Sequence, residues 1–163
     1  MKWSEFAAAS PKLAALGEER MEEHGLILLG TLRRDGSPRI SPVEPLLVDG
    51  ELELGMMWQS RKALDLLRDP RCQVHTVITD RDGTEGEFKL WGRARDLGRA
   101  ERDRYCVALE AKIGWRPKEP FHAFAIEIAS AAYRRFGGEG GKTYALVWKA
   151  GASTVETEQV HEA

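Results

Sequence analysis

The sequence of 163 residues lacks any apolar run that approaches the ~18 to 20 residues of a membrane-spanning helix. Its first segment, MKWSEFAAAS, also lacks the uninterrupted apolar core of a signal peptide, because Ser4 and Glu5 break it. From these two absences we expect a cytoplasmic protein with no membrane partner.

An excess of charge of one sign is also missing. Lysine and arginine number 24, aspartate and glutamate number 26, and the formal net charge is -2. Because the chain has no global positive field, we expect no nucleic-acid partner. With 42% hydrophobic and 31% charged residues, the composition is that of a soluble globular protein.

Cysteine and histidine are few and scattered. Cys72 and Cys106 form neither a CxxC pair nor a metal-ligand spacing, and we expect buried thiols, with a disulfide between them as the alternative. The four histidines show no HxxxH or HExxH spacing. The sequence therefore predicts no metal site.

Two motifs of enzyme chemistry are absent. No G-x-S-x-G elbow anchors a serine nucleophile. The stretch GGEGGKT resembles a phosphate loop, but that loop must open a helix, and here a strand is expected to follow. We interpret Gly137–Gly141 as a hairpin connector or a mobile lid, and we predict no catalytic side chain.

Apolar periodicity predicts one helix followed by mostly extended segments. Ser10-Pro11 and Gly25 bound a helix over about 10–24. Two Asp-Gly turns separate three expected strands over 25–32, 38–48 and 51–58, which would form a meander. Four more strands are expected over 72–79, 87–97, 121–136 and 142–151, with helices over 60–68 and 99–112.

These elements predict a mainly β fold (α+β), with six or seven antiparallel strands in a closed or half-closed barrel and flanking helices. A βαβ sheet is excluded, because no helix separates the first three strands. The three prolines of PRISPVEP are typical of an edge or bulged strand. We expect a single domain over 1–150 and a polar, disordered tail over 151–163.

The segment QSRKALDLLRDPR predicts a short helix with an unusual charge pattern. Ser60 is a good N-cap, while Arg61 and Lys62 add two cations to a helix end that is already partly positive. Such an end attracts an anion, and a phosphate monoester fits it. The alternative is an exposed helix in which Arg61 pairs with Asp65, a contact that would contribute roughly 0.2–0.5 kcal/mol.

Weaker candidates lie on the expected strands. If the Asp49-Gly50 hairpin forms, Arg39 shares a sheet with residues 55–57, although a solvent-facing arginine is the commoner case. Gly55 permits a close backbone approach or a bulge. Lys89 alternates with apolar neighbours, so its strand has a polar face that borders either solvent or a ligand cleft.

The stretch GTLRRDGSPRISPVEPLLVDGELELGMMWQSRKALDLLRDPR, followed by KLWGRARDL, resembles the pyridoxamine 5'-phosphate oxidase-like split β-barrel flavoproteins. The resemblance covers roughly residues 25 to 136 and implies a homodimer with flavin mononucleotide (FMN) at the subunit interface. It implies that Arg61 and Lys62 hold the flavin phosphate with Ser60 nearby, and that Lys89 is a contact from the partner subunit. The full set of implied cofactor-binding residues is Arg39, Ile40, Ser41, Pro42, Val43, Gly55, Met56, Ser60, Arg61, Lys62 and Lys89.

The resemblance also implies the reaction class. Hydride would move between the flavin N5 and a small-molecule substrate stacked on the ring, with substrate contacts from Gly137–Gly141 and from the segment Trp115-Arg116-Pro117. The namesake oxidase ends in a basic, aromatic-containing segment, whereas this chain ends in ASTVETEQVHEA, so pyridoxamine phosphate oxidation is not expected.

Related branches of this superfamily use the deazaflavin coenzyme factor 420 or bind haem, so three functional classes stay open. They are a flavin- or deazaflavin-dependent oxidoreductase, a flavin-binding carrier or sensor without turnover, and a haem-binding or haem-degrading protein. For the last class, His75 and His122 are the possible axial ligands.

Overall fold

The computed structural model describes residues 1–137 and 141–160, and over these residues the chain forms four helices and nine strands. In chain order they are α1 (Trp3–Ala9), α2 (Pro11–His24), β1 (Ile27–Leu32), β2 (Pro38–Val43), β3 (Pro45–Val48), β4 (Glu51–Met57), α3 (Arg61–Arg68), β5 (Arg71–Thr76), β6 (Glu87–Asp96), α4 (Arg99–Ile113), β7 (Phe121–Arg135), β8 (Lys142–Lys149) and β9 (Val155–Val160). Every strand pair is antiparallel, so the mainly β, antiparallel fold class is confirmed.

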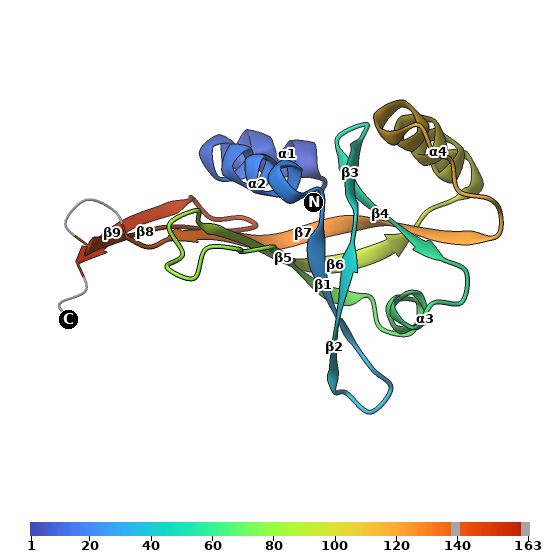
Figure 1. The fold of residues 1–163 in the computed structure, drawn as a ribbon, viewed down its shortest axis with the longest axis horizontal. Coiled ribbons are helices and arrows are strands. Elements are labelled where there is room, and N and C mark those ends of the chain that lie inside the picture. Colours follow the sequence, from blue (N-terminus) through green and yellow to red (C-terminus); the bar gives the residue numbers. More distant parts are fainter. Residues whose placement is uncertain (138–140, 161–163) are drawn as a thin grey trace.

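The strands follow the order β2-β1-β5-β6-β7-β4-β3, and β8 pairs with β7 and with β9. The long strand β7 makes this branching possible, because residues 121–125 pair with β4 while residues 130–135 pair with β8. The β8–β9 hairpin therefore extends away from the rest of the sheet, and α4 lies at the opposite end of the molecule (Figure 1).

The segment 38–48 is two strands, where the sequence predicts one. Glu44 separates the two strands, and Pro45, which has no N–H to donate to a ladder, begins the second one. β2 pairs with β1 and β3 pairs with β4, so the expected meander is two hairpins. The Asp49-Gly50 turn is confirmed, with φ values of 48° and 77°, and β2 lies at an end of the sheet order, as its prolines predict.

Two elements were not predicted. The expected helix over 10–24 is confirmed as α2, but the additional helix α1 precedes it. β9 lies within the segment for which the sequence predicts a disordered tail, and it pairs with β8 in a continuous register from Val147↔Val155 to Lys142↔Val160. Together with the break in 38–48, β9 accounts for nine strands in place of six or seven. Residues 138–140 of the expected connector Gly137–Gly141 lie outside the described residues.

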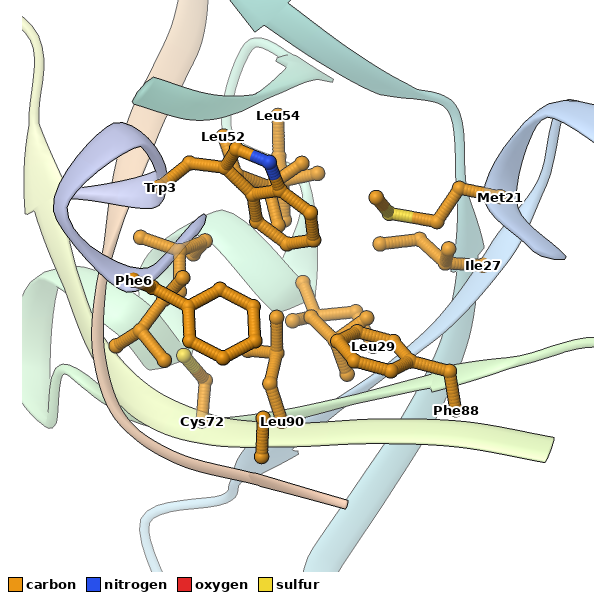
Figure 2. Close-up of a cluster of buried hydrophobic side chains, with 14 of the residues drawn as sticks. Trp3, Phe6, Met21, Ile27, Leu29, Leu52, Leu54, Cys72, Phe88 and Leu90 are labelled. Atoms are coloured by element: carbon orange, nitrogen blue, oxygen red, sulfur yellow. The ribbon is translucent and has the colours of Figure 1, made fainter. Parts of the chain in front are cut away.

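Helices α1 and α2 cover one hydrophobic core. Trp3 and Phe6 of α1 make an edge-to-face contact with ring centroids 5.3 Å apart, and both are buried beside Leu52 and Leu54 of β4 and Phe88 of β6 (Figure 2). A second core lies under α4 and contains residues from the other face of β7. The strand β7 thus contributes residues to both cores.

The two cysteines are free and buried, one in each core. The expectation of buried thiols is confirmed and the alternative of a disulfide is wrong. Burial raises the pKa of the Cys72 thiol to about 12, so this group is protonated and inert at neutral pH. Among the described residues, no helix is both long enough and apolar enough to span a membrane.

Candidate functional site

The start of helix α3 follows β4 through a tight turn. Ser60 N–H donates to the Met57 carbonyl at 3.1 Å, and Gln59 adopts a positive φ of 58° that reverses the chain. Ser60 is the N-cap residue, but its side chain makes no capping hydrogen bond. Its Oγ is buried and has no hydrogen-bond partner within residues 1–137 and 141–160. A buried hydroxyl without a partner at a helix N-terminus is a vacant donor for an anion.

Two cations stand beside this hydroxyl without a compensating acid. Arg61 is exposed and forms no ion pair with any described residue. Lys62 is partly buried, and its Nζ donates to the neutral Pro42 carbonyl at 3.0 Å. Burial lowers the pKa of Lys62, because desolvation opposes the charged form. The helix start therefore has positive charge that the described part of the chain leaves unneutralised.

Asp65, the acid that the sequence offers to Arg61, is used elsewhere. Its carboxylate accepts hydrogen bonds from Arg39 Nε at 2.7 Å, Thr31 Oγ1 at 3.1 Å and Arg68 at 3.3 Å. Burial opposes ionisation of Asp65, but these hydrogen bonds outweigh it and lower its pKa. The alternative interpretation, an Arg61–Asp65 pair, is therefore wrong.

The same contacts dock the strand β2 on α3. Arg39 binds Asp65 and Pro42 binds Lys62, so the fold brings together the predicted residues Arg39–Val43 and Ser60–Lys62. Within β2, Val43 is buried in the core while Ile40 is 71% exposed. Since Arg39 Nε is held by Asp65, the residue joins two elements, and a cofactor contact from it stays a prediction.

A cavity of about 360 Å³ lies at the C-terminal end of β4. The predicted residues Gly55 and Met56 line it, but the Tyr105 side chain packs against Gly55. A Cβ at Gly55 would overlap the Tyr105 side chain, so the glycine is required for the approach of α4 to β4. The complete lining is Glu44, Gly55, Met56, Met57, Trp58, Tyr105, Leu109, Trp115, Pro117, Lys118, Pro120 and Phe121.

Two partly exposed tryptophans, Trp58 and Trp115, line this cavity. Trp58 stacks on His122, with ring centroids 4.5 Å apart and an interplanar angle of 11°. Trp58 and Trp115 remain 51% and 56% exposed. The segment Trp115-Arg116-Pro117, predicted as a source of substrate contacts, thus contributes two of its residues to the lining. Sequence reasoning missed Trp58, although its place two residues before the Ser60 cap was a usable signal.

Lys89 lies apart from the other predicted residues. It lines a separate depression of about 250 Å³ with Trp91 and Val147, on the face formed by β5, β6, β7 and β8. Its Nζ pairs with Glu87 at 2.5 Å. The single chain does not bring Lys89 to α3, and its expected contribution from a partner subunit stays a prediction.

Sequence reasoning also missed a buried acid beneath α4. Glu53 is 2% exposed, and its Oε2 has no hydrogen-bond partner among the residues that the structure describes. Burial raises the pKa of this carboxyl to about 7, with further contributions from Glu51 and Glu101. The alternation of ELEL predicts one polar, exposed face, whereas all four residues of Glu51–Leu54 are buried.

A family model described as pyridoxamine 5'-phosphate oxidase matches residues 15–135. A search of curated proteins gave no match.

Among solved structures, PhzG from Burkholderia lata 383, in complex with tetrahydrophenazine-1-carboxylic acid, is similar with a TM-score of 0.65 and 12% identity, covering 98% of this chain and 93% of that one. A Clostridium acetobutylicum protein related to general stress protein 26 of B. subtilis, described as pyridoxinephosphate oxidase family, has a TM-score of 0.63 and 18% identity, and the match covers 85% of this chain and 96% of that one. HutZ, a haem storage protein from Vibrio cholerae, has a TM-score of 0.57 and 14% identity, and the match covers 74% of this chain and 89% of that one. At these identities the structures show a shared fold.

Proposed function

Because the chain belongs to the pyridoxamine 5'-phosphate oxidase family, we propose that it binds FMN through the N-terminus of α3 and acts as an oxidoreductase on a small-molecule substrate. The observation that supports this proposal is the uncompensated charge at Ser60–Lys62. The fold by itself does not choose the cofactor, since its neighbours include both PhzG and a haem storage protein.

The residues at α3 fit a phosphate monoester. The first N–H groups of a helix lack intrahelical acceptors and carry partial positive charge. Arg61 adds a guanidinium and Lys62 an ammonium, and the unpartnered Ser60 Oγ is a further donor. A bound phosphate would neutralise both cations and satisfy the hydroxyl, which no described acid does.

We further propose a homodimer with the cofactor at the subunit interface. Next to the phosphate-binding residues, Ile40 of β2 and Met57 at the end of β4 are 71% and 78% exposed. Large apolar side chains exposed to this degree beside a binding site are typical of an interface. Coverage by a second copy would remove them from water and would also shield a flavin ring from solvent.

A bound flavin supplies the hydride chemistry, and the chain supplies binding, orientation and exclusion of water. Ser60, Arg61 and Lys62 hold the phosphate. Asp65 fixes α3 against β2 through Arg39, so the phosphate-binding residues keep their position relative to the strand. This division of roles agrees with a sequence that offers no nucleophile.

The surroundings of the two candidate histidines, His75 and His122, favour haem ligation less than the helix start of α3 favours a phosphate. His75 has Nδ1 2.7 Å from the Thr76 carbonyl and Nε2 3.3 Å from Glu87, so both ring nitrogens are engaged. His122 is only 7% exposed and is covered by Trp58. Factor 420 stays the principal alternative, since it too carries a flavin-like ring.

The test is a pair of titrations with FMN and riboflavin, which differ only by the phosphate. We expect FMN to bind roughly 100-fold more tightly, because charge-assisted hydrogen bonds contribute about 1.5–3 kcal/mol each. The visible spectrum of the purified protein separates flavin, deazaflavin and haem. Equal affinity for FMN and riboflavin would overturn the proposed phosphate site, and a haem spectrum would overturn the flavin assignment.

A further inference from the structure

The cavity beside β4 has aromatic and apolar walls. Trp58 and Trp115 stand at its exposed side, and Tyr105, Leu109 and Phe121 form its buried side. Because His122 stacks on one face of the Trp58 ring, the orientation of that indole is set, and half of its surface remains open. Aromatic side chains arranged in this way favour a flat ring system that can stack on them.

The electrostatics of the cavity differ from those of α3. Glu44 and Lys118 are the two charged side chains in its lining, and their charges cancel. Burial raises the pKa of Tyr105 to about 12, so its phenol is neutral at physiological pH. A phosphate dianion here would meet one ammonium and one carboxylate, whereas at α3 it meets two cations and no described acid.

We propose that this cavity is the substrate subsite and that it selects planar aromatic molecules without a phosphate group. The inference rests on the proposed function, since the bound flavin would provide the redox partner for such a substrate. Phosphate recognition is thereby confined to α3, and the ring of the substrate is recognised by stacking and by burial of its apolar surface.

The experiment uses 2-naphthol and 2-naphthyl phosphate, which share one ring system and differ by the phosphate. Binding is measured by quenching of tryptophan fluorescence, and independently by calorimetry. Excess FMN, or inorganic phosphate if FMN does not bind, occupies α3 so that the naphthyl phosphate cannot report on that site. We expect 2-naphthol to bind at least about tenfold more tightly, because the phosphate of 2-naphthyl phosphate would lose its hydration in a cavity that offers no net positive charge.

Three variants assign the binding to the cavity. Trp115→Ala should weaken 2-naphthol binding by about tenfold through the loss of a stacking surface. Trp91→Ala is the matched control, because this tryptophan is also partly exposed but lines the separate depression with Lys89. Glu44→Gln should raise the affinity for 2-naphthyl phosphate by roughly fivefold, leaving that for 2-naphthol unchanged.

The inference would be overturned by equal or tighter binding of the phosphate compound to the wild-type protein, or by 2-naphthol binding that Trp115→Ala does not weaken. The wild-type comparison needs no variant, so it decides even if Trp115→Ala fails to fold. The two proposals fail separately. FMN binding without 2-naphthol binding removes only the subsite. 2-Naphthol binding without FMN binding removes the flavin assignment, and the cavity then keeps its selectivity for aromatic rings but not its role as the subsite of a flavin reaction.

Discussion

Helices α3 and α4 both begin after a strand of the same sheet, and both have arginine as their first helical residue, Arg61 in one and Arg99 in the other. At α4 the carboxylate of Glu101 accepts the Gly98 N–H at 2.8 Å and pairs with Arg95 at 2.9 Å. At α3 the first turn contains no acid, and the Ser60 hydroxyl makes no hydrogen bond within the described chain.

This difference separates a helix start that stabilises the fold from one that is available to a ligand. Both ends carry the same partial positive charge from their backbone dipoles. A glutamate in the first turn satisfies that charge and one free N–H group from inside the chain. Where two cations replace that glutamate, their repulsion from the positive helix end lowers the stability of the free protein. A bound anion would remove this repulsion and restore the stability.

The largest expected effect comes from removing both cations of α3. In Arg61→Ala/Lys62→Ala we expect FMN affinity to fall by roughly 100-fold, because two charge-assisted contacts to the phosphate are lost. We expect the free energy of unfolding of the FMN-free protein to change by less than about 1 kcal/mol, because the removal of like charges from a positive helix end offsets the loss of the exposed Lys62–Pro42 hydrogen bond. Fluorescence titration and urea unfolding measure the two quantities.

The matched control is Arg99→Ala, which removes an exposed arginine from the same position of α4. It should leave FMN affinity within about twofold of the wild type, since the effect of a surface charge declines over a Debye length. Retention of FMN by the double variant at wild-type affinity would refute the assignment of α3 as the phosphate site.

The second effect falls on stability. In Glu101→Ala, the Gly98 N–H loses its acceptor and Arg95 keeps only Glu51, which lies 3.0 Å away. We expect the free energy of unfolding to fall by about 1–2 kcal/mol, with FMN affinity unchanged. Urea unfolding of the FMN-free protein measures the loss. A variant that unfolds like the wild type but binds FMN poorly would reverse the roles given to the two helices.

The α3 site could be predicted from sequence because its signals are local. Ser60, Arg61 and Lys62 are adjacent, and their chemistry at a helix start follows from residue type alone. The hairpin at Asp49-Gly50 is equally local, since two residues with positive φ fix the turn. The same reasoning correctly placed three of the four helices.

The remaining features depend on residues that meet only after folding. The sequence offered Asp65 to Arg61 at helical spacing, but Arg39, 26 positions earlier, takes it. Gly55 was interpreted as space for a ligand or a bulge, and Tyr105 of α4 fills that space. Glu53 was not singled out at all, although folding buries it to 2% exposure. Each of these features depends on segments that are distant in sequence, so no local pattern predicts it.

Ser60→Ala is a smaller and cleaner change at α3. The hydroxyl makes no hydrogen bond in the described chain, so its removal should change the free energy of unfolding by less than about 0.5 kcal/mol. If it donates to the phosphate, FMN affinity should fall by roughly fivefold, as expected for one hydrogen bond. Riboflavin affinity should not change, and a parallel loss of riboflavin affinity would show that the variant disturbs something other than phosphate binding.

The smallest expected effects are those of pH, which act on α4 at acid pH and on α3 at alkaline pH. The Gly98 N–H lowers the pKa of Glu101, opposed by burial and assisted by Arg95. The folded-state pKa is therefore below the ordinary 4.5, so the contribution of Glu101 to stability is complete above that pH and is lost as the pH falls through the folded value. At α3, burial lowers the pKa of Lys62 from 10.5, so its charge, and with it FMN affinity, is lost as the pH rises toward that value.

Lys62→Arg tests the alkaline side, because a guanidinium stays charged over the whole range. We expect the ratio of FMN to riboflavin affinity to fall less than tenfold in the wild type between roughly pH 7 and 10, and to stay level in Lys62→Arg. The ratio cancels any ionisation of the flavin ring, and the range lies above the second ionisation of a phosphate monoester near about 6. If this ratio declined equally in both proteins at alkaline pH, the titrating group would not be Lys62. Arg61 would then be the one side-chain cation of the α3 start assigned to the phosphate.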